Sequence, residues 1–196
     1  PDILEYLGME YTHYAQDYSY KKMNGYDTRP MGSQGGNHFG FKNDSTADSW
    51  VEGVGTFMPA VIGHWYGLEG AGTFHHNNLE SNDYKPYTEK IRYLNSFGDE
   101  EYSIATLLWD MYDSDNKTDE GKDNVSMRIN QIWKLIKGYD AFSQHFPEHD
   151  SYGDRHIKYF KDFYDYMYDE SSMSGDEIDD LFLLHGIPQG WSRDGR

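Results

Sequence analysis

The amino-acid sequence predicts a mainly α-helical fold with long loops and little strand. In several segments, apolar residues recur every three or four positions, which is the spacing of one face of a helix. Stretches rich in Gly, Asn, Pro and acidic residues separate those segments and carry much of the charge, as loops do. Only the short stretch 91–94 favours a strand. We expect the 196 residues to form a single domain with a sizeable core.

The first predicted helix covers residues 2–20. An apolar stripe recurs along it at helical spacing, and we expect this stripe to face the core. Met9 and His13 are four positions apart with Glu10 between them, so Met9 and His13 project from one face of the helix. The residues of the apolar stripe are Ile3, Leu7, Tyr11 and Tyr14.

The second predicted helix follows a Gly- and Asn-rich loop and covers residues 46–67, with Asp44 or Ser45 as its N-cap. Pro59 should kink this helix or end its first segment, because proline removes a backbone donor. A third helix over 100–114 is apolar on nearly all sides, and we expect it to lie at the centre of the domain.

The C-terminal part of the chain contains three further predicted helices. The fourth begins near Ser126 and ends at Gly138, and the last covers 175–187, where Gly186 suits a C-terminal cap. The fifth, over about 154–169, carries an aromatic stripe that we assign to the core. The alternative is that its Tyr-rich run faces a neighbouring subunit, since tyrosine is favoured at interfaces. The stripe comprises Ile157, Phe160, Phe163, Tyr164 and Met167.

The composition excludes several classes of function. The chain has 34 Asp and Glu against 17 Lys and Arg, a formal charge of -17 that would repel a nucleic-acid backbone. Zero cysteines exclude disulfides and Cys-zinc sites. A membrane span needs about 18 consecutive apolar residues, and the sequence has no such run.

The composition, which is acidic and rich in Tyr and Gly, favours an extracellular or cell-surface protein. The opening PDILEYLGMEY lacks a signal sequence, so we expect a mature or processed piece of a longer product.

Acidic residues around the third helix suggest a second kind of site. Asp110 and Asp113 lie among apolar neighbours, and buried carboxylates need partners or a cation, so we expect them to brace the second helix or the following loop. The acidic stretch after this helix fails the EF-hand template, because Lys117 takes the place of an oxygen ligand. An irregular calcium site and a solvated acidic turn both remain open. The residues of that calcium site are Asp115, Asp119 and Asp123.

Several motifs, taken in order, point to one family. They are MEYTHY at 9–14, GGNH at 35–38, SWVEGVGTF at 49–57, SIATLLWDMYDS at 103–114 and LFLLHGI at 181–187. Their order and spacing resemble a family of secreted bacterial and archaeal gluzincin-like zinc metallopeptidases, which pair an H-E-Y-G-H helix with a W-x-E-G-x-A helix and an LWD-x-YD helix. The resemblance covers nearly the whole chain. It implies the helical C-terminal-type subdomain of such a peptidase.

The resemblance implies a zinc site on two helices. His13 and Glu52 would be zinc ligands and Glu10 the general base that activates water. Met9 stands where the family has its first ligand, and Thr12 where it usually has Gly. A thioether is a neutral, soft donor that suits copper(I) better than zinc, so two ligands remain where catalytic zinc needs three. Three further residues are candidates to hydrogen-bond to the ligands without contacting the metal, namely His38, Asp110 and Asp113.

Two functions from different classes follow. The first is a metallopeptidase-like domain with impaired zinc-dependent hydrolysis of peptides or proteins. The second is a non-catalytic cell-surface or filament-forming module that assembles through its Tyr-rich, acidic faces. The family's strand-rich N-terminal half is absent or lies on a separate chain. A cleft lined by Glu10, His13 and Glu52 would favour the first function, and tight packing of Met9 across it would favour the second.

Overall fold

The computed structural model describes residues 3–24, 46–68, 72–74, 77–80, 100–113, 125–142 and 158–185. These residues are mainly helical with very little strand, which confirms this part of the predicted fold class. The two short strands form an antiparallel hairpin in which Thr73 pairs with Asn78 and Phe74 with Asn77. The elements in order are α1 (Ile3–Asn24), α2 (Thr46–Trp65), β1 (Thr73–Phe74), β2 (Asn77–Asn78), α4 (Glu100–Tyr112), α5 (Ile129–Phe142), α6 (Lys158–Glu170) and α7 (Gly175–Leu184).

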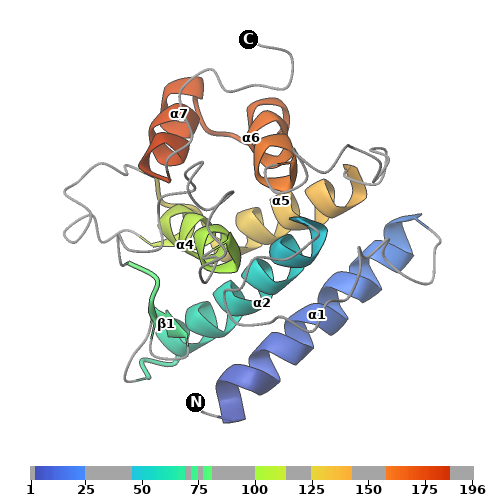
Figure 1. Cartoon of the computed structure of the whole chain (residues 1–196), viewed down its shortest axis with the longest axis vertical. Helices are drawn as coiled ribbons and strands as arrows, with labels where there is room; N and C mark the ends of the chain where they lie inside the picture. Colours follow the sequence, from blue (N-terminus) through green and yellow to red (C-terminus); the bar gives the residue numbers. More distant parts are fainter. Residues whose placement is uncertain are drawn as a thin grey trace, which may run out of the picture.

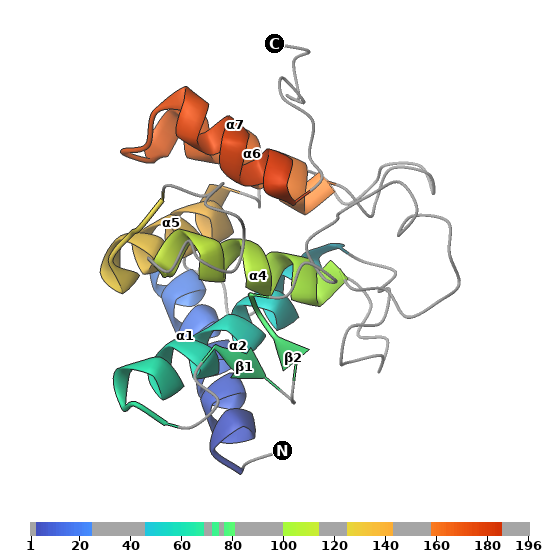
Figure 2. The same cartoon turned by 90° about the vertical axis from the view of Figure 1, so that its left-hand side faces the viewer.

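The helices form three layers. Figures 1 and 2 show α4 and α5 between the α1–α2 pair and the α6–α7 pair. Helix α1 lies at the edge of this arrangement, where it contacts α2 and α5. The β1–β2 hairpin lies beside the C-terminal end of α2. None of the helices in the described part of the chain combines the length and apolar character of a membrane span.

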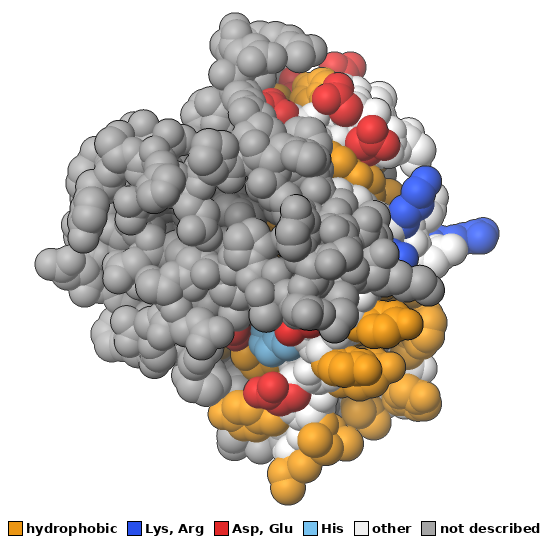
Figure 3. Space-filling model, turned by 90° about the vertical axis from the view of Figure 1, so that its right-hand side faces the viewer, with side chains coloured by type: hydrophobic (Ala, Val, Ile, Leu, Met, Phe, Trp, Pro, Cys, Tyr) orange, Lys and Arg blue, Asp and Glu red, His pale blue; other side chains and the backbone are white. Residues whose placement is uncertain are grey.

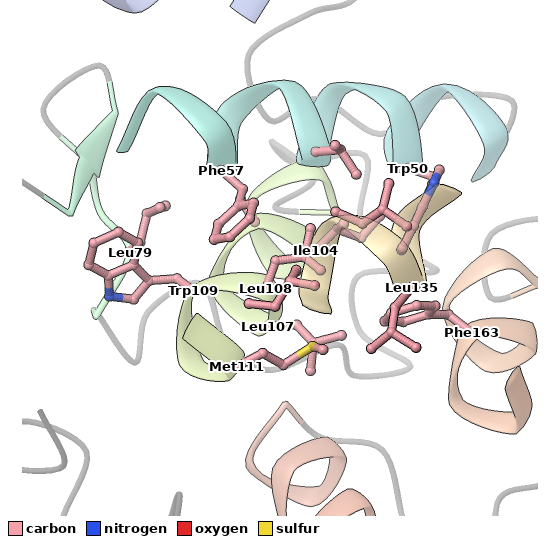
Figure 4. Close-up of a cluster of buried hydrophobic side chains, with 14 of the residues drawn as sticks. Trp50, Phe57, Leu79, Ile104, Leu107, Leu108, Trp109, Met111, Leu135 and Phe163 are labelled. Atoms are coloured by element: carbon pink, nitrogen blue, oxygen red, sulfur yellow. The ribbon is translucent and has the colours of Figure 1, made fainter. Parts of the chain in front are cut away.

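The core lies mainly between α2 and α4, and Figure 4 shows a cluster of its buried side chains. Helix α4 is buried along nearly its whole length, so the prediction that it lies at the centre is confirmed. Gly53 allows α2 and α4 to approach closely, since a Cβ added there would lie 2.6 Å from Cβ of Ile104. Core residues labelled in the figure include Trp50, Phe57, Ile104, Leu107, Leu108, Met111, Leu135 and Phe163.

The prediction that the apolar stripe of the first helix faces the core is wrong. Its residues, Ile3, Leu7, Tyr11 and Tyr14, are all exposed. Helix α1 instead buries the opposite face, which carries Met9, Thr12 and Gln16. Gly55 of α2 makes room for this face, since a Cβ there would lie 3.2 Å from Met9 Cγ. The periodicity therefore located a helix but assigned its inner face incorrectly.

Helix ends also differ from the predictions. Helix α2 continues through Pro59 to Trp65, so the proline does not end it. Helix α5 begins at Ile129, because residues 125–128 have no regular secondary structure and the Met127 N–H donates to the Met111 carbonyl at 2.7 Å. Helix α5 also continues past Gly138. A Cβ there would lie 2.0 Å from the Tyr166 hydroxyl oxygen, so this glycine accommodates α6 and does not end the helix.

The α6–α7 layer agrees with the prediction in part. Phe163, Tyr164 and Met167 are buried, which confirms the core assignment for that part of the aromatic stripe. Ser174 caps α7 with Glu177 in a capping box, and the helix ends at Leu184. Several predicted features lie outside the described residues: the N-cap at Asp44 or Ser45, the strand at 91–94, the position of Ile157, the side chain of Phe160, the cap at Gly186 and the acidic stretch after Asp113.

Candidate functional site

The predicted site lies where α1 and α2 pack together in antiparallel directions. Gly8 of α1 lies against Pro59 of α2, and a Cβ at Gly8 would be 3.1 Å from the proline Cγ. One turn earlier in α2, a Cβ at Gly55 would be 2.6 Å from His13 Cε1 and 3.2 Å from Met9 Cγ. The glycine thus makes room for the imidazole. Gly53 and Gly55, on either side of Val54, bring α4 and α1 close to the same turn of α2.

His13 and Glu52 meet across this packed surface. The distance between His13 Nε2 and Glu52 Oε2 is 3.5 Å, with side-chain exposures of 18% and 7%. This distance exceeds that of an ordinary hydrogen bond. It is close to the separation of about 3.4 Å between two ligands on one tetrahedral zinc ion with bonds of about 2.0–2.2 Å. Neither ring nitrogen of His13 makes a hydrogen bond among the described residues.

Gln16 is a buried polar residue that the sequence interpretation missed. It follows His13 by three positions on α1 and is 0% exposed. Neither its amide nitrogen nor its amide oxygen finds a hydrogen-bond partner in the described part of the chain. Buried amide groups are almost always hydrogen-bonded in folded proteins. Its spacing from Met9 and His13 places it on the same helix face, so helical periodicity applied to polar residues would have found it.

Met9, Thr12 and Glu10 have different surroundings. Met9 is 8% exposed and belongs to the hydrophobic core. The buried Thr12 hydroxyl donates to the Gly8 carbonyl at 2.7 Å, so the side chain that departs from the family pattern is satisfied within its own helix. Glu10 is exposed. The structure therefore brings His13 and Glu52 together, packs Met9 beside them and leaves Glu10 open to solvent.

Asp110 and Asp113 are both buried, as predicted. The sequence predicted that these two residues brace α2 or the following loop. It did not predict the partner that the structure shows for Asp110. Its Oδ2 lies 2.9 Å from Nε2 of His185 at the end of α7, and both side chains are fully buried. His185 is 75 positions away in the sequence, so local spacing carried no signal for this pair. Asp110 thus joins α4 to α7.

The remaining predicted ligands lie outside the described residues. These are His38 and the calcium candidates Asp115, Asp119 and Asp123. Within the described ranges, no group of three or more His, Cys, Asp or Glu side chains is arranged to hold a metal ion. The part of the site that can be described is therefore a pair of ligand-type groups, His13 and Glu52, with the buried thioether of Met9 beside them.

Comparison with known proteins adds no relative. No protein-family model, no curated protein and no solved structure matches this chain.

Proposed function

We propose that this chain is a metallopeptidase-like domain of gluzincin ancestry, outside the cell or at its surface, whose zinc site is incomplete. One observation carries the proposal: His13 Nε2 and Glu52 Oε2 lie 3.5 Å apart. An imidazole and a carboxylate from two helices, at the separation of two ligands on one tetrahedral zinc, are the pair that the sequence resemblance implies. Nothing in helix packing alone requires these two residue types to meet.

The chemistry of the side chains assigns their roles. His13 and Glu52 hold the ion, and zinc, when bound, supplies a Lewis acid for a peptide carbonyl group. Glu10 precedes His13 by three positions and is exposed, so its carboxylate is open to accept a proton from an attacking water. Met9 offers only a neutral thioether in place of the third ligand. Zinc binding by this chain is therefore weak and its peptide hydrolysis impaired.

A non-catalytic assembly module is the second candidate, and the position of Met9 favours it. Met9 is 8% exposed and lies close to Gly55, so its side chain fills space between α1 and α2. A residue packed in this way contributes to stability and not to metal chemistry. Under this second function, the chain keeps the helical scaffold of a peptidase and uses its surface for binding.

The test is to restore the missing ligand. We would measure the zinc content and zinc affinity of the native chain and of Met9→His, and assay both on an unstructured protein substrate. We expect zinc affinity to rise at least about tenfold in Met9→His, because three protein ligands then surround the ion. Met9→Leu is the matched control, since it conserves volume and adds no ligand.

The outcomes separate the two candidates. Hydrolysis by Met9→His that disappears when Glu10→Gln is added would support a peptidase scaffold impaired at one residue. Unchanged zinc affinity in a folded Met9→His chain would contradict the metal site and leave the assembly module. His13→Ala in the Met9→His background should lower zinc affinity again if the ion lies between α1 and α2.

A further inference from the structure

The outer face of α1 exposes a row of large apolar side chains. Each is more than half exposed, although residues of these types are usually buried. Figure 3 shows hydrophobic side chains gathered over the part of the surface where α1 lies. The residues are Ile3, Leu4, Leu7, Tyr11, Tyr14 and Tyr18, and the name outer stripe is used for them below.

The spacing of the outer stripe is that of a helix that packs along another helix. From Leu4 to Tyr18 the apolar residues are separated by three, four, three and four positions, as at positions a and d of a coiled coil. The tyrosine rings form a continuous row, since the centroids of Tyr11 and Tyr14 and those of Tyr14 and Tyr18 are each 6.4 Å apart. A length of about 21 Å results from the helical rise.

No described element of the chain covers this face. Helix α1 contacts α2 through Gly8, Met9 and His13, none of which belongs to the outer stripe. The six side chains expose on the order of 800 Å², which is comparable to one partner's share of a stable interface. Exposed apolar patches of several hundred Å² mark interaction sites on soluble proteins.

Charge decides what kind of partner fits. Glu10 and Asp17 are exposed, seven positions apart, and form one border of the outer stripe. Gly8 and Ala15 form the other border and carry no charge. Two copies of the chain would gain no attraction between these borders, and each copy carries a charge of -17. A surface with Lys or Arg beside its apolar residues would gain attraction along the whole acidic border.

We propose that the outer stripe of α1 docks an amphipathic helix of a different protein, with apolar residues at heptad spacing and Lys or Arg along its edges. The apolar row supplies the buried area, and Glu10 and Asp17 select the basic partner. The proposal does not depend on zinc binding, because His13 and Glu52 meet on the other side of α1. Glu10 is shared with the proposed function, so the variants that test the outer stripe are placed at Leu7 and Tyr11, which have no part in the zinc site.

The test uses a synthetic peptide of three Leu/Lys heptads, with a Leu/Glu peptide of the same length as its counterpart. We would measure binding to the full chain by fluorescence anisotropy at physiological salt. We expect the Leu/Lys peptide alone to bind, and Leu7→Ser with Tyr11→Ser to weaken binding at least about tenfold, because the centre of the row is lost. Circular dichroism would establish that the double variant folds.

Leu183→Ser is the matched control, because Leu183 of α7 is 55% exposed and Leu7 is 59% exposed. It should leave peptide binding unchanged. Equal binding of the Leu/Lys peptide to the native chain and the double variant would overturn the proposal, since charge alone would then explain capture. A concentration-dependent dimer that the double variant abolishes would overturn it in favour of a second copy. Binding to phosphatidylcholine vesicles that requires Leu7 would overturn it in favour of a membrane surface.

Discussion

Two buried polar clusters in this molecule differ in how well their groups are partnered. Between α6 and α7, the Asp179 carboxylate accepts hydrogen bonds from the hydroxyl groups of Tyr164, at 2.5 Å, and Tyr168. On the buried face of α1, the amide of Gln16 and both ring nitrogens of His13 make no hydrogen bond within the described residues. The first cluster is complete as a structural element. The second keeps polar groups that its own packing does not use.

The difference shows what each cluster contributes. Buried polar groups that are fully hydrogen-bonded make a fold rigid and specific, whereas unpartnered ones cost free energy. The pKa of Tyr168 is raised, first by burial and then by its hydrogen bond to Asp179, as expected for a structural hydroxyl that stays protonated. The unpartnered polar groups of His13 and Gln16 on the buried face of α1 do not make the fold rigid in this way.

The largest effect is expected at the complete cluster. Asp179→Ala leaves the buried Tyr164 hydroxyl without its acceptor, and we expect the free energy of unfolding to fall by about 2–4 kcal/mol. The measurement is urea unfolding of the native chain and the variant. Asp180→Ala is the matched control on the same helix, because Asp180 is exposed and should change stability by less than about 0.5 kcal/mol. A similar loss in both variants would show that the cluster has no special role.

The opposite sign is expected at the incomplete cluster. Gln16→Leu replaces an unpartnered buried amide by an apolar side chain of similar size, so we expect the free energy of unfolding to rise by about 1 kcal/mol. Thr12→Val is the contrast on the same helix face. The Thr12 hydroxyl has a partner, so this change should bring no gain. If Gln16→Leu destabilised the chain by more than about 1 kcal/mol, the amide would have a partner in solution and the difference between the clusters would disappear.

The sequence predicted the helical architecture well where periodicity and burial agree. Helix α4 is apolar around its circumference, so its central place followed directly from its composition. Helix α1 has a row of apolar residues on one face, and on the other Met9 together with polar residues such as Thr12 and Gln16, and here the rule failed. The close approach allowed by Gly55 selects the face with Met9 and His13, and this depends on a second helix that periodicity does not consider.

Only the contacts between residues of the short motifs could be predicted from the sequence. The resemblance paired His13 with Glu52, and these two residues lie 3.5 Å apart. The contact between Asp110 and His185 depends on how α4 and α7 pack, and no motif spans it. Gln16 was not predicted, because glutamine carries no charge and is not a common metal ligand. Tertiary packing, and not local sequence, decides which polar groups meet.

A smaller effect is expected where the polar groups are partnered but exposed. The Ser174 hydroxyl accepts from the Glu177 N–H at 3.3 Å, and the Glu177 carboxylate accepts from the Ser174 N–H at 2.7 Å. Ser174→Ala removes the N-cap of α7, and we expect a loss of about 1 kcal/mol, measured by urea unfolding. Ser172→Ala is the control, because Ser172 is an exposed serine outside the cap. An equal change in both variants would show that the cap contributes nothing to stability.

The smallest effect is a dependence of stability on acid. The pKa of Glu177 is lowered, first by the hydrogen bond from the Ser174 N–H and then by the Ser174 hydroxyl, because both favour the carboxylate. A group whose pKa is lowered on folding stabilises the fold above its unfolded pKa, and this contribution disappears as the pH falls through the lower folded pKa. The pH range in which this stabilisation is lost therefore begins near 4.5, the ordinary pKa of Glu, and extends below it.

Glu177→Gln tests this dependence, because it keeps an acceptor at this position but cannot titrate. The stability difference between the native chain and Glu177→Gln, measured by urea unfolding at pH 7 and pH 3, should therefore shrink in acid. A difference that stays constant between the two pH values would mean that the carboxylate of Glu177 is not stabilised by the cap.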